Sequence, residues 1–314
     1  MKNYIRIGLM TVALAAAQAG SALADSAHPK IIVVTHGQSN DSFWSVVKNG
    51  VIQAGKDYGA TVEYQAPQTF DMTLMAQLID AAVNQQPDGL VVSNPDPSAL
   101  GPAIKHAVAA GIPVISINSG ADAAKGLGVL IHVGQDESVA GRIAGEQLKA
   151  AGGKKAICIN PEPGNVAVDN RCRGFEEGFG RKAVTIPTSF DPEENAAKVR
   201  AALESDPSID TIMALGAVGS GDGVLDALTK LNAFGKYKVA TFDMTPRFLK
   251  AVQEGKVMFC VDQQQFLQGY LGVALMALYD RYGVLPAANI QAGPSLVTSK
   301  TANRVVDLVS KGIR

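Results

Sequence analysis

The sequence predicts an α/β protein of two similar lobes, each built on a doubly wound parallel sheet, joined by short hinge strands. Three observations support this fold class. Short β-branched runs alternate with amphipathic stretches of helical period, which is typical of parallel sheets covered by helices. The alternation restarts after Val133-Gly134. The 314 residues contain no linker rich in proline, glycine or serine, so we expect two domains of ordinary size in close contact.

The first half contains four short apolar runs typical of buried strands, at 31–34, 61–64, 90–92 and 112–117. Between them lie three stretches with apolar residues at helical spacing, at 43–58, 72–85 and 97–110. Glycine or a Pro-Asp-Gly turn follows each helix and ends it. This order predicts a parallel sheet with helices on both faces.

The second half repeats the pattern. Strands are expected at 155–159, 184–188, 211–215, 238–241 and 257–261, and helices at 138–151, from 171, at 195–204, 223–231, 245–254 and 266–282, and from 301. We expect an N-terminal lobe of residues 28–132 plus about 263–289, and a C-terminal lobe of about 133–262 plus 290–314. A ligand would bind between the two lobes, which would close around it.

The first residues have the pattern of a cleavable signal peptide. Lys2 and Arg6 precede an apolar run over 7–17, and Ala22-Leu23-Ala24 is an A-x-A cleavage signal. The run is shorter than the roughly 20 residues of a membrane-spanning helix. We expect residues 1–24 to be removed, with cleavage near Ala24, and the mature protein to act in the periplasm.

Charge and motifs exclude several classes of protein. The chain has 28 basic and 29 acidic residues, a balance that offers no electrostatic surface for nucleic acid and suits a neutral ligand. It contains no G-x-S-x-G, H-E-x-x-H or P-loop motif. His36, His106 and His132 share no metal-ligand spacing and are expected to be surface or structural residues. We expect no catalytic residues, no cofactor and no metal.

Three cysteines are present, Cys158, Cys172 and Cys260, and their spacing matches no metal motif. Cys158 lies near the end of a predicted strand and Cys172 near the start of the following helix. These two can approach each other, so we expect them to form a disulfide in an oxidising compartment. Cys260 lies in an apolar run and is expected to be a buried free thiol.

Polar and aromatic side chains follow the carboxyl ends of most predicted strands, where doubly wound sheets bind ligands. These positions hold Asp41, Phe43, Trp44, Asn118, Ser119, Phe190, Asp243 and Gln263. One of the adjacent pair Phe43 and Trp44 should be core, because neighbouring helix positions point in different directions. Asp243 fits a ligand contact or a helix N-cap equally well, and Arg171 fits a ligand contact or a surface arginine.

A sugar presents apolar C–H faces and hydroxyl edges, so its site needs flat aromatic rings beside fixed polar groups. Further short segments occur in a definite order: 39–44, Pro87-Asp88-Gly89-Leu90, Gly111-Ile112-Pro113-Val114-Ile115, His132-Val133-Gly134, Ala140-Gly141, Arg171-x-x-Gly174-Phe175, Thr241-Phe242-Asp243 and Asp262-Gln263-Gln264. Together they resemble the type I periplasmic sugar-binding proteins, the ribose- and galactose-binding group that serves ABC transporters. The resemblance covers nearly the whole mature chain.

The resemblance implies a set of ligand-binding residues: Thr35, Asp41, Phe43, Trp44, Asn118, Ser119, Arg171, Phe190, Asp243 and Gln263. We expect Arg171 to lie at a solvent-filled cleft when the lobes are open, so its removal should weaken binding and leave folding intact. Ribose-like members carry Asp-Arg where this chain has Asn118-Ser119, and an asparagine where it runs Leu215-Gly216-Ala217-Val218. The expected ligand is therefore a small neutral sugar or polyol, with a furanosyl autoinducer-type signal as the alternative.

By the same resemblance, the expected partners are the membrane permease of an ABC transporter and a chemoreceptor, with the protein acting as a monomer. Two other classes share this fold. The effector domain of a sugar-responsive regulator would begin with a helix-turn-helix, and a signal-peptide pattern stands there instead. A secreted enzyme would need a nucleophile and a base. Asp41 and Asp243 could form a carboxylate pair, but the sequence shows no nucleophile and base that belong together.

Overall fold

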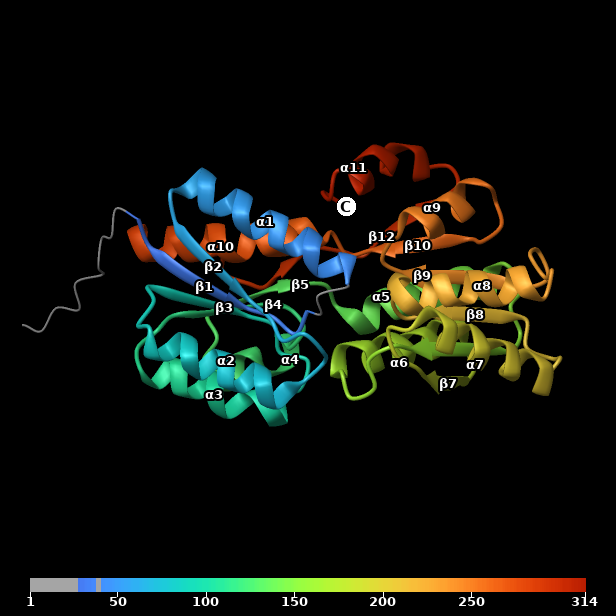
Figure 1. The fold of residues 1–314 in the computed structure, drawn as a ribbon, viewed down its shortest axis with the longest axis horizontal. Helices are drawn as coiled ribbons and strands as arrows, with labels where there is room; N and C mark the ends of the chain where they lie inside the picture. Colours follow the sequence, from blue (N-terminus) through green and yellow to red (C-terminus); the bar gives the residue numbers. More distant parts are fainter. Residues whose placement is uncertain (1–27, 38–40) are drawn as a thin grey trace, which may run out of the picture.

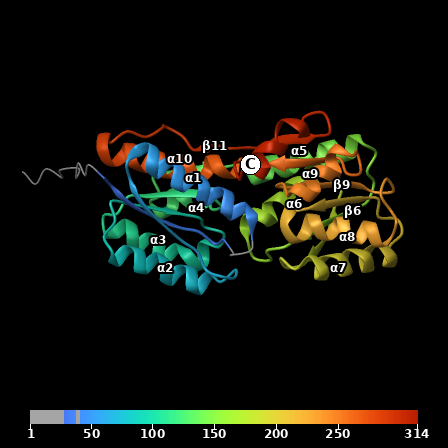
Figure 2. The ribbon, with the colours of Figure 1, turned by 45° about the horizontal axis from the view of Figure 1, so that its top comes forward.

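The protein folds into two lobes that lie side by side along its longest axis (Figure 1). The structure is a computed structural model and describes residues 28–37 and 41–314, so the predicted signal peptide lies outside the described residues. Each lobe contains a six-stranded sheet: all neighbouring strands of the first sheet are parallel, and the second sheet has one antiparallel pair, β10 with β12. Helices cover both faces of each sheet (Figures 1 and 2). The predicted fold class is confirmed.

The first sheet has the strand order β11-β5-β4-β3-β1-β2. Its strands are β1 (Lys30–Val34), β2 (Thr61–Gln65), β3 (Gly89–Val92), β4 (Val114–Asn118), β5 (Ile131–Gly134) and β11 (Ile290–Gln291). The helices of this lobe are α1 (Ser42–Tyr58), α2 (Met72–Asn84), α3 (Pro97–Ala109), α4 (Ala121–Ala124) and α10 (Gln265–Tyr282). One hydrophobic core lies under α1 and α10, and a second lies under α2 and α3.

The second sheet has the order β12-β10-β9-β8-β6-β7. Its strands are β6 (Ala156–Asn160), β7 (Ala183–Pro187), β8 (Thr211–Ala214), β9 (Lys238–Phe242), β10 (Phe259–Asp262) and β12 (Ser295–Thr298). The helices are α5 (Glu137–Ala150), α6 (Val166–Phe179), α7 (Pro192–Ser205), α8 (Asp222–Lys230), α9 (Pro246–Gln253) and α11 (Val306–Ser310). The core under α5 and α6 lies opposite the core under α7, α8 and α9.

The chain passes between the lobes after β5, after β10, and between β11 and β12. The first sheet therefore extends two residues beyond each expected boundary, to Gly134 and to Gln291. The reason is that β11 pairs with β5, with Ile290 opposite Val133 and Gln291 opposite Gly134. No helix in the described part of the chain is long and apolar enough to cross a membrane.

Two further differences concern helix ends. The helix expected from Arg171 begins at Val166, because Asn165 caps it by accepting the N–H of Ala167 at 3.0 Å. Arg171 therefore lies in the interior of α6 instead of at its start. The last helix, expected from Thr301, is a 3₁₀ turn followed by the five-residue α11.

Cys158 and Cys172 are paired in the structure, with their Cα atoms 6.2 Å apart. Cys158 lies in β6 and Cys172 in α6, and both are buried. Cys260 lies in β10 as a buried free thiol. The disulfide ties β6, which lies between β8 and the edge strand β7, to the helix that carries Arg171.

A thiol count tests this pairing. Unfolded, unreduced protein is expected to expose one reactive thiol, from Cys260, and three after reduction. The oxidised protein should be more stable than the reduced protein by about 3 kcal/mol, because the bridge closes a loop of about 15 residues in the unfolded chain. Denaturant titrations of the two forms measure this difference. Three reactive thiols before reduction would contradict the pairing.

Candidate ligand-binding site

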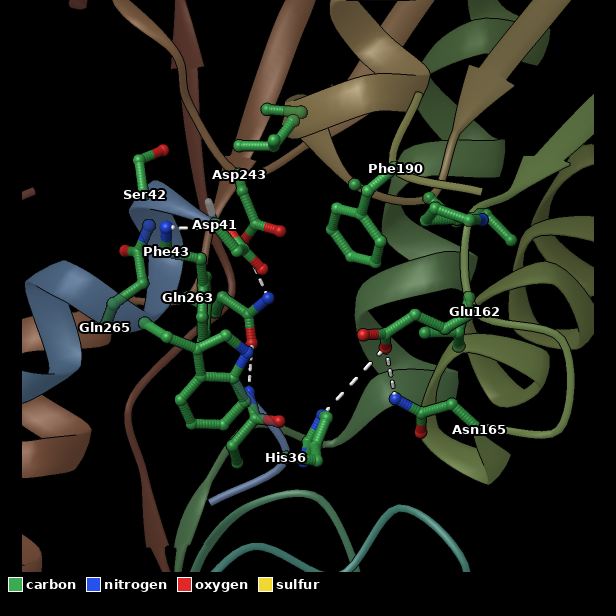
Figure 3. A pocket seen from close by; sticks show the side chains of 18 of the residues that line it. His36, Asp41, Ser42, Phe43, Glu162, Asn165, Phe190, Asp243, Gln263 and Gln265 are labelled. Carbon is green, nitrogen blue, oxygen red and sulfur yellow. Dashed lines mark hydrogen bonds and ion pairs between the residues drawn. The ribbon is translucent and has the colours of Figure 1, made fainter. Parts of the chain in front are cut away.

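A cavity lies between the two lobes, at the edge where strands of both sheets end (Figure 3). Its empty volume is about 520 Å³, including space open to solvent at the mouth. The first lobe lines it with residues after β1 and at the end of β4, and the second lobe with residues after β6, β7, β8 and β9.

Most residues expected to bind ligand lie together in this cavity. Its lining includes Asp41, Phe43, Trp44, Asn118, Arg171, Phe190, Asp243 and Gln263. Thr35 and Ser119 are not part of the lining. The Thr35 hydroxyl lies 2.7 Å from the Tyr64 hydroxyl, and Ser119 donates to Asn118 Oδ1 at 2.7 Å. These two hydroxyls support neighbouring side chains.

The start of α1 supplies an aromatic wall from the first lobe. Asp41 caps this helix by accepting the N–H of Phe43 at 2.9 Å. Trp44 packs edge-on against Phe43 and His36, with ring centroids 5.1 and 4.6 Å apart. A Cβ at Gly37 would lie 2.4 Å from Trp44 Cγ, so a glycine is needed beside the indole. Phe43 and Trp44 both belong to the lobe's core, although only one of them was expected to be a core residue. Both also border the cavity.

Phe190 borders the cavity from the second lobe, on the loop after β7 (Figure 3). Its main chain packs against Gly219, where an added Cβ would lie 2.9 Å from Phe190 Cα. Gly219 also has a φ of 70°, which favours glycine. The adjoining run Leu215-Gly216-Ala217-Val218 lines the cavity too, so this part of its wall carries no polar side chain.

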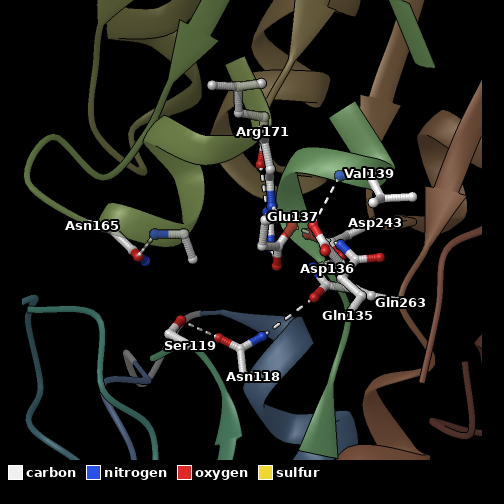
Figure 4. Close-up of polar contacts among 12 residues, drawn as sticks. Asn118, Ser119, Gln135, Asp136, Glu137, Val139, Asn165, Arg171, Asp243 and Gln263 are labelled. Carbon is white, nitrogen blue, oxygen red and sulfur yellow. Dashed lines mark hydrogen bonds and ion pairs between the residues drawn. The ribbon is translucent and has the colours of Figure 1, made fainter. Parts of the chain in front are cut away.

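Gln263 connects the two lobes by hydrogen bonds at the hinge (Figures 3 and 4). Its amide nitrogen donates to Asp243 Oδ1 at 2.6 Å, and its Oε1 accepts from Asn118 Nδ2 at 3.3 Å. The Gln263 main-chain oxygen accepts from Gln268 Nε2 at 2.8 Å. Asn118 and Asp243 have left-handed backbone, with φ of 63° and 64°, which these residue types tolerate better than most. The chain of contacts orients polar groups of both lobes around the cavity.

Arg171 reaches the cavity from α6 and is held by its own lobe (Figure 4). Its Nε and Nη2 donate to the Glu137 carboxylate at 2.7 and 2.9 Å, and its Nη1 donates to the Leu215 carbonyl at 2.8 Å. The guanidinium carbon lies 4.6 Å from the centroid of the Phe242 ring. The side chains of Arg171 and Glu137 are each only 6% exposed. Arg171 is therefore buried in this structure instead of facing a solvent-filled cleft.

His36, Glu162 and Asn165 also line the cavity, although the sequence patterns did not single them out as ligand contacts. His36 follows β1 and Glu162 follows β6, so the rule that ligands bind beyond strand ends applies to both. His36 is not a surface residue, because it is buried at 2% exposure. Asn165 donates to Glu162 Oε2 at 2.6 Å. The sequence patterns also did not single out Glu137, the partner of Arg171. This residue lies in the first turn of α5 and not directly after a strand.

Burial dominates the electrostatics of the cavity. It raises the pKa of Asp41, Glu162 and Asp243 to about 7 in each case, against opposing hydrogen bonds or the Arg171 charge. Burial, with Arg171 adding to its effect, lowers the pKa of His36 to about 3, so the imidazole is neutral. Although burial opposes the charge of Arg171, Glu137 raises the pKa of this arginine above its ordinary value. The wall thus combines carboxyl acceptors, neutral donors and aromatic rings. Among the described residues, no group of three His, Cys, Asp or Glu could hold a metal ion.

A profile of the periplasmic binding protein domain matches residues 31–280, which span both lobes and the cavity. The chain belongs to the periplasmic binding protein family. The ribose import binding protein of Salmonella typhimurium is 26% identical over 292 residues, which cover 90% of this chain and 94% of that protein. The xylose/arabinose-binding protein of Sulfolobus acidocaldarius is 25% identical over 293 residues, which cover 87% of this chain and 72% of that protein.

Solved structures show the same architecture for this periplasmic binding protein. A carbohydrate transporter from Acidothermus cellulolyticus, in complex with myo-inositol, is 34% identical with a TM-score of 0.85, covering 91% of this chain and all of that one. An ABC transporter solute binding protein from Burkholderia graminis, in complex with D-arabinose, is 22% identical with a TM-score of 0.81, covering 88% and 97%, and shows the fold. The resemblance to type I periplasmic sugar-binding proteins is thereby confirmed.

Removing the guanidinium is expected to destabilise the whole lobe. Arg171→Ala leaves the buried Glu137 carboxylate unpaired, and breaking a buried pair in this way lowers the unfolding free energy by about 3–5 kcal/mol. The double variant Arg171→Met/Glu137→Gln removes both charges and should recover most of the loss. Urea denaturation of the wild type, Arg171→Met, Glu137→Gln and the double variant measures the coupling, and Arg171→Ala is measured beside them. Wild-type stability in Arg171→Ala would contradict the role assigned to the pair.

Proposed function

We propose that this periplasmic binding protein captures a small neutral sugar or polyol between its lobes for uptake by an ABC importer. One observation carries the proposal: aromatic side chains lie beside carboxyl, amide and imidazole groups of both lobes in one cavity. The rings of Phe43, Trp44 and Phe190 suit the C–H faces of a sugar. The polar groups suit its hydroxyls, which both donate and accept hydrogen bonds.

The charges around the cavity support an uncharged ligand. The Arg171 guanidinium, which would attract an anion, already holds Glu137 in a two-point pair. The His36 ring is neutral because burial lowers its pKa. The carboxyl groups of Asp41 and Asp243, whose pKa burial raises to about 7, accept hydrogen bonds from hydroxyl groups.

The relatives support the same ligand class. Two are named for ribose import and for xylose and arabinose binding, and a third holds myo-inositol. The run Leu215-Gly216-Ala217-Val218 offers no side-chain amide where the ribose-like pattern has one. This difference favours a ligand other than ribose.

The remaining steps of the proposal concern where the protein acts. Residues 1–24 would be cleaved near Ala24, and the mature monomer would work in the periplasm, carrying its ligand to a membrane permease and presenting it to a chemoreceptor. The ligand leaves unchanged, because no nucleophile and base are arranged for catalysis among the described cavity residues.

Trp44, the only tryptophan, should report ligand binding. It borders the cavity and is 5% exposed, so a ligand that displaces water beside the indole is expected to shift its fluorescence. Pentoses, hexoses, inositols, linear polyols and furanosyl signals would be screened by thermal shift, because a ligand at 100 times its Kd adds about 2.7 kcal/mol of stability. If no compound in the panel raises Tm, the proposed function is wrong.

The control for this screen is Trp44→Phe, which removes the reporter and keeps an aromatic ring. Calorimetry should still detect ligand binding to this variant, while the tryptophan signal disappears. A ligand that binds the wild type by calorimetry without changing its fluorescence would remove Trp44 from the site.

We also expect the lobes to close on the ligand. Polar groups from both lobes meet in one cavity, and in the described part of the chain only three crossings join the lobes. Small-angle scattering should therefore give a smaller radius of gyration at saturating ligand than without it. An unchanged radius would contradict closing even if the ligand is a sugar.

A further inference from the structure

His36 and Glu162 approach each other across the cavity from opposite lobes (Figure 3). His36 Nε2 lies 3.9 Å from Glu162 Oε2, and the two side chains are only 2% and 8% exposed. This separation is too long for a direct hydrogen bond, but one oxygen atom can lie about 2.8 Å from both atoms. The pair therefore has the spacing of two groups that bind a third.

The contacts of His36 assign the hydrogen on its ring. Ser93 Oγ accepts the main-chain N–H of His36 at 2.9 Å and lies 2.7 Å from His36 Nδ1. A hydroxyl that accepts this N–H can still donate its own hydrogen to Nδ1, and in that arrangement the ring hydrogen of the neutral imidazole lies on Nε2. His36 consequently presents an N–H donor to Glu162.

Glu162 presents an acceptor to the same space. Its Oε2 accepts from Asn165 Nδ2 at 2.6 Å, and Asn165 is itself fixed as the N-cap of α6. Within the described residues, no hydrogen bond to Glu162 Oε1 is found, and the side chain borders the cavity. The carboxylate is therefore oriented by its own lobe and still has acceptor capacity for another group.

We propose that His36 and Glu162 form a subsite for one ligand hydroxyl, which accepts from the imidazole of the first lobe and donates to the carboxylate of the second. The subsite rests on the proposed function and adds two residues to the ligand contacts that the family resemblance implies. A hydroxyl matches this pair because it both donates and accepts. An ammonium group can only donate, so it would place a second donor against the imidazole N–H. A ligand carboxylate can only accept, so it would place a second acceptor against Glu162.

The position of the subsite also links the lobes. Next to Asn165, the Val166 N–H at the start of α6 donates to the Pro95 carbonyl of the first lobe at 3.0 Å. The loop that carries Glu162 thus meets the first lobe through this backbone contact. A hydroxyl bound between His36 and Glu162 adds a second connection at the same place and favours the closed arrangement.

The subsite is tested with a ligand from the panel and three isosteric variants. Glu162→Gln keeps an oxygen on Asn165 at the Oε2 position, but it removes the negative charge and replaces the Oε1 acceptor by an NH₂ donor. His36→Asn removes the donor at the Nε2 position, whereas His36→Gln keeps an N–H there. Glu177→Gln, on the exposed face of α6, is the matched control. Circular dichroism and Tm without ligand verify that each variant is folded.

Calorimetry should show binding at least about tenfold weaker for Glu162→Gln and His36→Asn, as expected for a lost charged or buried hydrogen bond. His36→Gln should lose less than His36→Asn, and Glu177→Gln should bind like the wild type. Wild-type affinity in both Glu162→Gln and His36→Asn would overturn the subsite and leave the proposed function standing. A wild type that binds nothing in the panel would overturn the proposed function itself.

A second measurement uses the unmodified protein and removes one hydroxyl at a time from the ligand. One deoxy analogue should bind the wild type at least about tenfold more weakly, and Glu162→Gln should no longer distinguish it from the parent ligand. If Glu162→Gln discriminates against every deoxy analogue as strongly as the wild type does, no hydroxyl is bound by Glu162 and the proposal is wrong.

Discussion

The ion pair between Arg171 and Glu137 is the constraint on which the second lobe's wall of the site depends. Two N–H groups of the guanidinium reach one carboxylate, and a third reaches the Leu215 carbonyl, while the guanidinium lies against the Phe242 ring. These contacts join α5, α6 and β9 to the segment after β8. A planar fork satisfies all of them in one orientation, which a lysine could not do. The side chains around it are therefore held in position before any ligand enters.

Hydrogen bonds of Gln263 at the hinge connect this wall of the second lobe to the first lobe. Gln263 follows β10, where the chain crosses between lobes, and it bonds to Asn118 of one lobe and Asp243 of the other. Asn118 and Asp243 are held in left-handed backbone at the ends of β4 and β9. Such conformations cost of order 1–3 kcal/mol in most residues and persist where the surroundings require them. Both residues line one cavity, so the polar geometry at this edge comes with a backbone conformation that few residue types adopt.

The fold was predictable because its signals are local, whereas part of the site depends on contacts between distant segments. Each buried strand such as 31–34 is a continuous apolar run followed by a helical pattern, so its type and order could be read directly. Glu137 could not be identified in this way, because its role arises only when α6 packs beside α5 and brings Arg171 to it, 34 residues later. The start of α6 depends on the Asn165 cap, and the two-residue β11 forms only because the chain returns beside β5.

The buried carboxyl groups connect ligand binding to lobe closing. Asp41 belongs to the first lobe, Glu162 and Asp243 to the second, and burial raises the pKa of each to about 7. In an open cleft, water would donate hydrogen bonds to these groups, but in a closed cavity the donors must come from the protein or the ligand. The protein supplies some, from the Phe43 N–H, from Asn165 and from Gln263. A carboxylate can accept more than one hydrogen bond, so closing without a ligand leaves acceptor capacity unmet. A ligand rich in hydroxyls would supply the missing donors in the closed arrangement alone, and this difference in interaction between the two arrangements would drive the lobe closing that we propose.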